Sequence, residues 1–320
     1  MKKTKLVIFI LFIGLILIVI TGCSNNEINN IMIIDSIGID KDNDKYLMSF
    51  NTYIGNDKYK VITIKVDSLD KSFEDIYLQA NKKIYLSHLN LLFLSSNLDN
   101  LDITNIINTF NNKSDLRGSF QVIMVDDYNK DILKENSLDI INLIKNNHHE
   151  IGSISPTSFN NIVSNYLDMG ISYIPVINHN LNIIGTHSLF DEYSFYNIDE
   201  SKYLNLVLDK SNDLILNIDN EEVKVRDIDI FYQINNSNIK IKIYMKYISN
   251  LEEITIKNYI LDNINKFLNS EINLNYFKSL IKKYDYSNYS DNLNVNFELE
   301  LFLNKDNINN IKEDNIIEKD

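Results

Sequence analysis

The sequence holds one cysteine, two prolines, eight glycines and no tryptophan among 320 residues. A single thiol excludes an internal disulfide, so the fold has to depend on its hydrophobic core. The few glycines form no glycine-rich phosphate loop, and the nucleophile-elbow pattern G-x-S-x-G is absent. The sequence therefore lacks common motifs of nucleotide binding and covalent catalysis, whereas its hydrophobic content of 44% agrees with a globular core.

Positive charge is also scarce. The net charge is -13 at pH 7, with 31 Lys and Arg against 44 Asp and Glu. Nucleic-acid binding depends on cationic side chains that displace counterions from phosphates. The sequence shows no stripe of Lys and Arg with interleaved aromatic residues, so we expect no nucleic-acid partner.

The N-terminus has the layout of a signal peptide. Lys2, Lys3 and Lys5 precede an apolar run over residues 6–20, which is shorter than the roughly 18 to 20 residues of a transmembrane helix. Ile20, Thr21, Gly22 and Cys23 follow as a lipobox, in which a thiol nucleophile can take a diacylglyceryl group. We predict that residues 1–22 are removed and that lipid is attached to Cys23. The alternative is an uncleaved N-terminal anchor with an incidental cysteine.

Lipid on Cys23 is strong enough to hold this acidic chain at a membrane. Cleavage removes three lysines and leaves a mature charge of -16. Each charge near the surface matters by roughly 1 kcal/mol against anionic headgroups, whereas each buried lipid CH₂ contributes about 0.8 kcal/mol. Two acyl chains therefore outweigh the repulsion.

After a polar tether over residues 24–30, strands and helices alternate. Alternating apolar and polar residues predict a three-stranded antiparallel sheet, and apolar residues at helical spacing over residues 69–85 predict a helix that covers it. The strands of this part are expected at residues 31–39, 46–53, 59–66, 89–94 and 120–125, with a further helix around Ile103, Ile106, Ile107 and Phe110.

The second half continues in the same way. Helices are expected over residues 137–145 and between Pro156 and Gly170, and a hairpin is expected from two strongly alternating strands, 223–234 and 239–248. Other expected elements are strands at 173–177, 183–190, 193–196 and 295–303, and two helices around Ile256, Ile260, Ile264, Phe267 and Leu268 and around Phe277, Leu280, Ile281 and Tyr284.

These elements predict a multi-domain α+β protein with mixed or antiparallel sheets and packed helices. We expect an N-terminal α+β domain over residues 23–182, a middle α+β domain over 183–236 and a C-terminal β-α-α-β domain over 237–304. Residues 305–320 are polar and are expected to be a disordered tail.

No residue pattern predicts a metal site. Asp40, Asp42 and Asp44 have the spacing of the first calcium-loop ligands, but Lys45 and Asn51 occupy the positions that need Gly and Glu, which favours a solvated hairpin turn. Two histidines and a glutamate at 148–150 lack a partner at metal-ligand spacing, and adjacent residues on a helix point about 100° apart, so a polar helix end is favoured. We expect no metal, no cofactor and no catalytic residue. A pair of carboxylates for acid–base work, brought together by the fold, stays open as an alternative.

Several short segments, in order along the chain, resemble one family. They are Gly22-Cys23 with Glu27-Ile28, Ile37-Gly38-Ile39-Asp40, Leu86-Ser87-His88-Leu89, Gly170 with Pro175, Ile184-Gly185 leading to Leu189-Phe190, and the closing helix, helix and strand to Leu303. In this order, behind a lipobox, they resemble the Ger(x)C lipoproteins, which are the C subunits of spore germinant receptors. The resemblance extends over nearly the whole mature chain.

The chain also departs from the family pattern. Ser24, Asn25 and Asn26 stand where the family usually has Trp and a charged pair, and Ser87 stands where Gly is usual. The segment between Leu280 and Asn294 is shorter than in the family. These differences bear on the choice of partner more than on the fold.

The resemblance implies a non-enzymatic subunit of three small α+β domains on the outer face of the spore inner membrane. Its implied partners are the integral membrane subunits of a germinant receptor, and its implied role is scaffolding or signal transmission. The main alternative is a lipid-anchored substrate-binding protein that feeds a transporter, although the predicted hairpins argue against repeated βα units around a cleft. A cell-surface hydrolase is a third possibility.

The lipobox generates the first prediction. Substitution of Cys23→Ala removes the thiol that would receive lipid, so metabolic labelling with a radioactive fatty acid should be lost. The protein should either leave the membrane fraction or accumulate as an uncut precursor. A cleaved Cys23→Ala protein that still partitions with membranes would show that another anchor exists.

Overall fold

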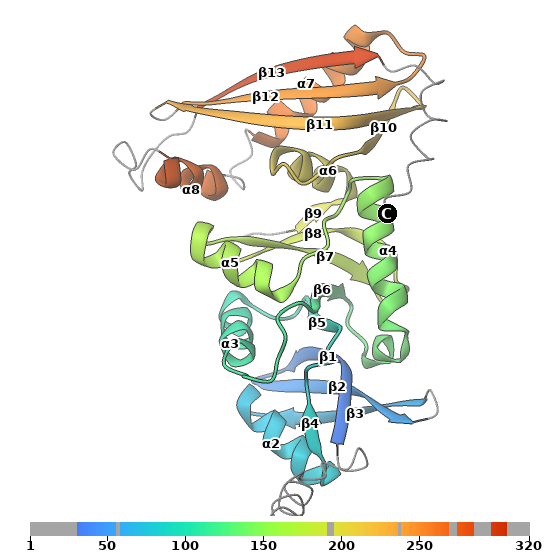
Figure 1. The fold of residues 1–320 in the computed structure, drawn as a ribbon, viewed down its shortest axis with the longest axis vertical. Coiled ribbons are helices and arrows are strands. Elements are labelled where there is room, and N and C mark those ends of the chain that lie inside the picture. The colour runs from blue at the N-terminus through green and yellow to red at the C-terminus, as the bar shows by residue number, and fades with distance from the viewer. Residues whose placement is uncertain are drawn as a thin grey trace, which may run out of the picture.

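The computed structural model describes residues 31–55, 58–190, 195–235, 238–268, 274–284 and 296–305. The predicted signal peptide, Cys23 and residues 306–320 of the predicted tail lie outside these residues, so the predictions for them stay untested. Lys305, expected to begin the tail, ends the last described strand. The described part contains two mixed sheets with packed helices (Figure 1). The predicted α+β fold class is confirmed.

The first sheet, sheet A, has nine strands within the described residues. In spatial order they run β3-β2-β1-β5-β6-β7-β8-β9, and β4 pairs with the beginning of β1. The strands are β1 (Ile31–Asp42), β2 (Lys45–Gly55), β3 (Lys58–Val66), β4 (Lys83–Tyr85), β5 (Leu91–Ser95), β6 (Gln121–Asp126), β7 (Ser172–Asn178), β8 (Ile183–Leu189) and β9 (Phe195–Asn197). Strands β1, β5, β6 and β7 are parallel, and antiparallel hairpins flank them on both sides.

Helices cover both faces of sheet A, and the strand sequences reflect this. The β5 residues Leu92 and Leu94 pack in a core with α2 (Leu69–Ala80), α3 (Asn100–Asn111) and α5 (Phe159–Met169). Leu91 and Phe93 point to the opposite face and pack with the short helix η2 (Lys130–Lys134) and α4 (Ser137–Glu150). A strand that is buried on both faces needs a continuous apolar run, which explains the sequence Leu-Leu-Phe-Leu of β5.

The second sheet, sheet B, is covered on one face. Its order is β10 (Leu214–Ile218), β11 (Glu221–Asn235), β12 (Asn238–Ile248) and β13 (Asn296–Lys305). In β12, Ile239, Ile241, Ile243 and Met245 are buried beneath α7 (Glu253–Leu268) and α8 (Leu274–Tyr284), while the alternate residues face outward. The predicted hairpin between β11 and β12 is confirmed, and β13 returns parallel to β12 after the two helices.

Helix α6 (Ile198–Val207) lies between the two sheets (Figure 1). It contacts β8 and β9 on one side and α7 on the other, and every residue from Ser201 to Val207 is buried. The Asn205 amide donates to the carbonyl of Gly152 at 3.2 Å, and its oxygen accepts a bond from the Ser155 hydroxyl at 3.0 Å. The Tyr232 hydroxyl of sheet B donates to the carbonyl of Val207. Helix α6 thus lies buried between the two sheets and bonds to groups on both sides.

The helix predicted over residues 69–85 is shorter than expected. It ends at Ala80 because Asn81 adopts the left-handed conformation, with φ of 49°. Ile84, expected on this helix, lies in β4, where the parallel pairing of Met32 with Ile84 holds it against β1. Helix α4 continues five residues beyond its expected end at Lys145. Helix α5 begins at Phe159 with Ser158 as its N-cap, so Pro156, expected in the first turn, lies before the helix. The expected helix end at Gly170 is confirmed.

The pairings also bear on the expected domain boundaries. Residue 182 lies in the turn between β7 and β8, and residue 236 lies between β11 and β12, so each boundary falls within a hairpin of one sheet. The division into three domains stays a prediction, while the strands themselves group into residues 31–197 and 214–305.

Two glycines allow a matched test of the β8–β9 pairing. Gly170 (φ +72°) has open space where a Cβ would lie, whereas a Cβ on Gly185 (φ +156°) would lie 1.9 Å from the carbonyl oxygen of Tyr196 in β9. Gly170→Ala should reduce the free energy of unfolding by about 1–2 kcal/mol, the cost of the left-handed conformation. Gly185→Ala should reduce it more, because strain and a backbone clash combine. Urea unfolding followed by circular dichroism measures both, and equal losses would contradict this account of β9.

Candidate functional site

Cys23, the predicted lipid-attachment residue, lies outside the described residues. Among the helices that the structure describes, none combines the length and apolarity needed to cross a bilayer. The described part offers candidate features on its surface and among its buried polar groups.

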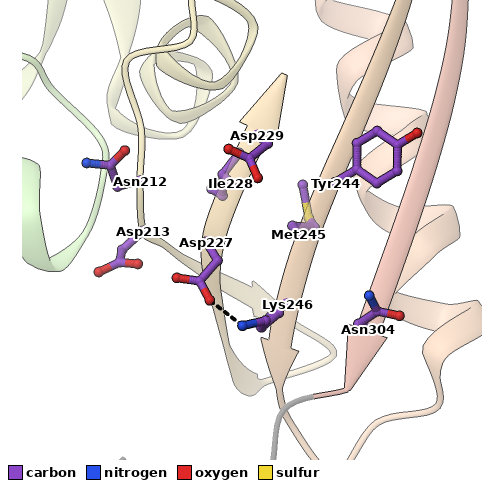
Figure 2. Close-up of a pocket in the computed structure, with 9 residues that line it drawn as sticks. All are labelled: Asn212, Asp213, Asp227, Ile228, Asp229, Tyr244, Met245, Lys246 and Asn304. Carbon is purple, nitrogen blue, oxygen red and sulfur yellow. Dashed lines mark hydrogen bonds and ion pairs between the residues drawn. The ribbon is translucent and has the colours of Figure 1, made fainter. Parts of the chain in front are cut away.

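A depression of about 560 Å³ lies on the outer face of sheet B (Figure 2). A bulge in β11 shapes it, because the register of β11 against β12 shifts between Arg226 and Asp229, and Asp227 has a positive φ of 48°. The residues that line it are Asn212, Asp213, Asp227, Ile228, Asp229, Tyr244, Met245, Lys246 and Asn304.

Carboxylates dominate this depression. Asp227 accepts a bond from the Lys246 ammonium at 2.6 Å. Burial raises the pKa of Asp213, and the Asp227 carboxylate adds to this, although Arg226 acts in the opposite direction. Among the residues that the structure describes, no three His, Cys, Asp or Glu side chains come together in a way that could hold a metal ion. The depression is thus an acidic surface feature without a recognisable catalytic set.

An exposed group of aromatic rings adjoins the depression, and we call it the aromatic patch. It consists of Phe231 on β11, Tyr244 on β12 and Phe302 on β13, all of which are exposed. The rings of Tyr244 and Phe302 stack at 4.6 Å, and Phe231 meets Tyr244 edge-on at 5.8 Å. Three adjacent exposed aromatic rings are typical of protein-contact surfaces, in which aromatic residues are enriched.

The best-connected buried carboxylate in the described residues is Asp102, which is 3% exposed. Its oxygens accept bonds from the Lys41 ammonium at 2.8 and 2.9 Å and from the Tyr46 hydroxyl at 2.7 Å. Asp102 also forms a capping box with Asp99 at the beginning of α3. Burial acts to raise the pKa of Asp102, but these bonds outweigh it and hold the pKa below its usual value.

Asp102 was not predicted from the sequence, although the sequence contains a signal. The pattern Asp99-x-x-Asp102 after a short loop is a capping-box pattern, and it placed a carboxylate in the first turn of a predicted helix. The partners Lys41 and Tyr46 lie about 60 residues earlier, so only the fold reveals them. The bonds of Asp102 to Lys41 and Tyr46 hold α3 against the β1–β2 hairpin, so the role of these three residues is structural.

The candidates named from sequence are not brought into one site. Asp42 bonds to Lys65 and Asp40 accepts from Asn97, as expected of a hairpin turn and its neighbours. His148 lies near the end of α4, where its Nδ1 is 2.9 Å from the carbonyl oxygen of Ile154. Burial lowers the pKa of His148, which favours a neutral ring. These contacts agree with a hairpin turn at Asp40 and Asp42 and with a polar helix end at His148.

Comparison with known proteins adds independent findings. A family model described as the spore germination protein N-terminal domain matches residues 24–179. A crystal structure described as that of the GerBC protein superposes with a TM-score of 0.52 at 14% identity, covering 85% of this chain and 97% of the GerBC chain. At this identity the superposition shows a shared fold. None of the curated proteins compared with the chain matches it.

The Asp102 group generates a prediction about stability and pH. Tyr46→Phe removes one hydrogen bond to a buried carboxylate and should lower the free energy of unfolding by about 1.5–3 kcal/mol at pH 7. Because the pKa of Asp102 is depressed in the folded state, the stabilisation is present above the unfolded pKa of about 3.9 and is lost as pH falls through the folded pKa. The difference between the two proteins should therefore shrink below about pH 4.

The matched control is Tyr244→Phe in the exposed aromatic patch, which should change stability by less than about 0.5 kcal/mol. Urea unfolding between pH 3 and pH 8 provides the measurement. Equal effects of the two substitutions, or a Tyr46→Phe effect independent of pH, would contradict the role given to Asp102.

Proposed function

Because the chain belongs to the Ger(x)C family of spore germination proteins, we propose that it is the lipid-anchored subunit of a nutrient germinant receptor. In this proposal the protein performs no catalysis. It acts as a scaffold or signal-transmitting partner of integral membrane subunits on the outer face of the spore inner membrane.

The observation that carries the proposal is the family match over residues 24–179. The match begins at the residue after Cys23, so the matched domain would be the first folded part to follow the lipid. The superposition on GerBC extends the likeness of the fold over most of the chain.

Physical constraints support a role in contact. Lipid on Cys23 would confine the protein to the membrane plane, where a modest interface suffices because tethering raises the effective concentration of the partners. The tether, residues 24–30, spans at most about 25 Å when extended. Sheet A would therefore stay close to the extracytoplasmic loops of membrane partners.

The surface of the described part also favours contact over chemistry. The depression of Figure 2 is acidic, and the side chains that line it form no recognisable arrangement of nucleophile, general base and orienting group. The aromatic patch beside it, by contrast, has the composition of a protein-contact surface.

The central strands of sheet A give some support to the alternative, a substrate-binding protein. Strands β1, β5, β6 and β7 are parallel, which the predicted hairpins did not suggest, and ligands of α/β sheets bind at the carboxyl ends of such strands. At this edge, however, polar side chains bond to one another: Ser96 donates to Asp126, and Asn97 donates to Asp40. This mutual pairing favours the receptor subunit.

Deletion of the gene tests the proposal. Germination by the nutrients that use this receptor should be blocked, while artificial triggers that bypass receptors should still act. Insertion of 20 flexible residues after Ser24 should lower the effective concentration of the domain at its partner by roughly eightfold, since this quantity falls as the −3/2 power of tether length.

The control for the insertion replaces residues 25–30 by six Gly and Ser residues, which keeps the length and should leave the response unchanged. Normal germination of the deletion strain with every nutrient would contradict the receptor role and favour the substrate-binding alternative.

A further inference from the structure

The end of sheet A that contains the first described residue exposes several large apolar side chains. Tyr53 and Ile54 lie near the end of β2, Tyr59 lies near the beginning of β3, and Tyr77 and Leu78 lie in the last turn of α2. Ile54 and Leu78 are 59% and 72% exposed. We call these five residues the β2–β3 pole.

Two hollows border the pole. A hollow of about 440 Å³ joins the beginning of β1, the β2–β3 hairpin and the end of α2. The residues that line it are Ile31, Met32, Thr52, Tyr53, Ile54, Lys60, Val61, Ile62, Gln79, Ala80 and Lys82. The rings of Tyr53 and Tyr59 meet edge-on at 5.5 Å beside it. Tyr77 and Leu78 border a second hollow, which is more apolar, next to Ile84 of β4.

The charge of the pole at the β2–β3 hairpin differs from that of the whole chain. The hollow at the hairpin is lined by two lysines, Lys60 and Lys82, and by no acidic residue, although the chain carries a net charge of -13. Lys83 is exposed next to Lys82. Asp70 and Glu74 border the second hollow together with Tyr77, Leu78 and Lys113, so that side of the pole carries both signs of charge.

The chain enters the fold at this pole. Ile31 is the first described residue, and its pairing with Lys83 places it beside the turn that follows α2. Seven residues, 24–30, separate the lipid-attachment cysteine from Ile31, and the eight Cα–Cα steps from Cys23 to Ile31 span at most about 29 Å when fully extended. Sheet B lies at the opposite end of the molecule (Figure 1). The pole is therefore the described surface that the anchor holds nearest to the bilayer.

We infer that the β2–β3 pole sits in the headgroup region of the bilayer that carries the anchor. Tyrosine rings and aliphatic side chains suit the boundary between headgroups and acyl chains, and lysines pair with anionic headgroups while their stems stay in apolar surroundings. This inference rests on the proposed lipid anchor. It gives the subunit an orientation, with the pole at the membrane and the aromatic patch of sheet B held away from it.

The absence of tryptophan from the sequence allows a test without background tryptophan fluorescence. Leu78→Trp and Tyr53→Trp place single probes at the pole, and Phe231→Trp places a matched probe on the aromatic patch; all three positions are exposed, so the core is not disturbed. The full chain, purified from membranes, is reconstituted into vesicles of phosphatidylcholine and phosphatidylglycerol whose acyl chains carry bromine. Emission is compared with that in unbrominated vesicles.

The pole probes should be blue-shifted and quenched at least twofold, whereas the Phe231→Trp probe should be unaffected. Lys60→Glu with Lys82→Glu should reduce quenching of the Leu78→Trp probe in vesicles with phosphatidylglycerol, without releasing the anchored protein. If the protein floats with the vesicles but the pole probes are not quenched, the inference is wrong while the lipid anchor stands. The pole would then face a protein neighbour. A protein that does not float with the vesicles would overturn the anchor and the inference together.

Discussion

The burial of α6 between the two sheets is the constraint on which the described architecture depends. Its residues from Ser201 to Val207 are buried, and both of its flanks are occupied, by β8 and β9 on one side and by α7 on the other. A buried polar residue such as Asn205 is tolerated because its amide is satisfied by Ser155 and Gly152. Ser155 and Gly152 belong to the segment between α4 and α5, which adjoins sheet A. From sheet B, the Tyr232 hydroxyl bonds to the carbonyl of Val207 in α6. A change in the position of either sheet would have to disturb these bonds.

The proposed contact role rests on features of the described surface. The described residues contain no group of metal ligands, the acidic depression on sheet B lacks a catalytic set, and the best-connected carboxylate, Asp102, is committed to holding α3 on the β1–β2 hairpin. What the surface offers is an exposed aromatic patch at one end and an apolar, lysine-bearing pole at the other. With the pole near the membrane, α6 would connect the membrane-facing sheet to the sheet that carries the patch.

The elements that sequence predicted well are those whose own residues determine them. The β1–β2–β3 and β11–β12 hairpins follow from local alternation, and Gly170 ends α5 as its conformational freedom suggests. Helix α6 was missed because a helix that is buried all round carries no apolar stripe, and β4 was missed because only its pairing with β1 makes it a strand. Some contacts join segments that lie far apart in the sequence, so residue spacing does not predict them. They are the parallel pairing of β1 with β5 and the bonds of Lys41 and Tyr46 to Asp102.

The central claim is that this family member acts through integral membrane partners, and copurification tests it most directly. The full chain with a C-terminal affinity tag is purified from spore membranes in mild detergent, and the proteins that accompany it are identified by mass spectrometry. The account predicts that integral membrane subunits copurify in amounts comparable to the tagged chain, and that they are lost when Cys23→Ala removes the anchor. Recovery of the tagged, membrane-bound chain without any integral membrane protein would contradict it.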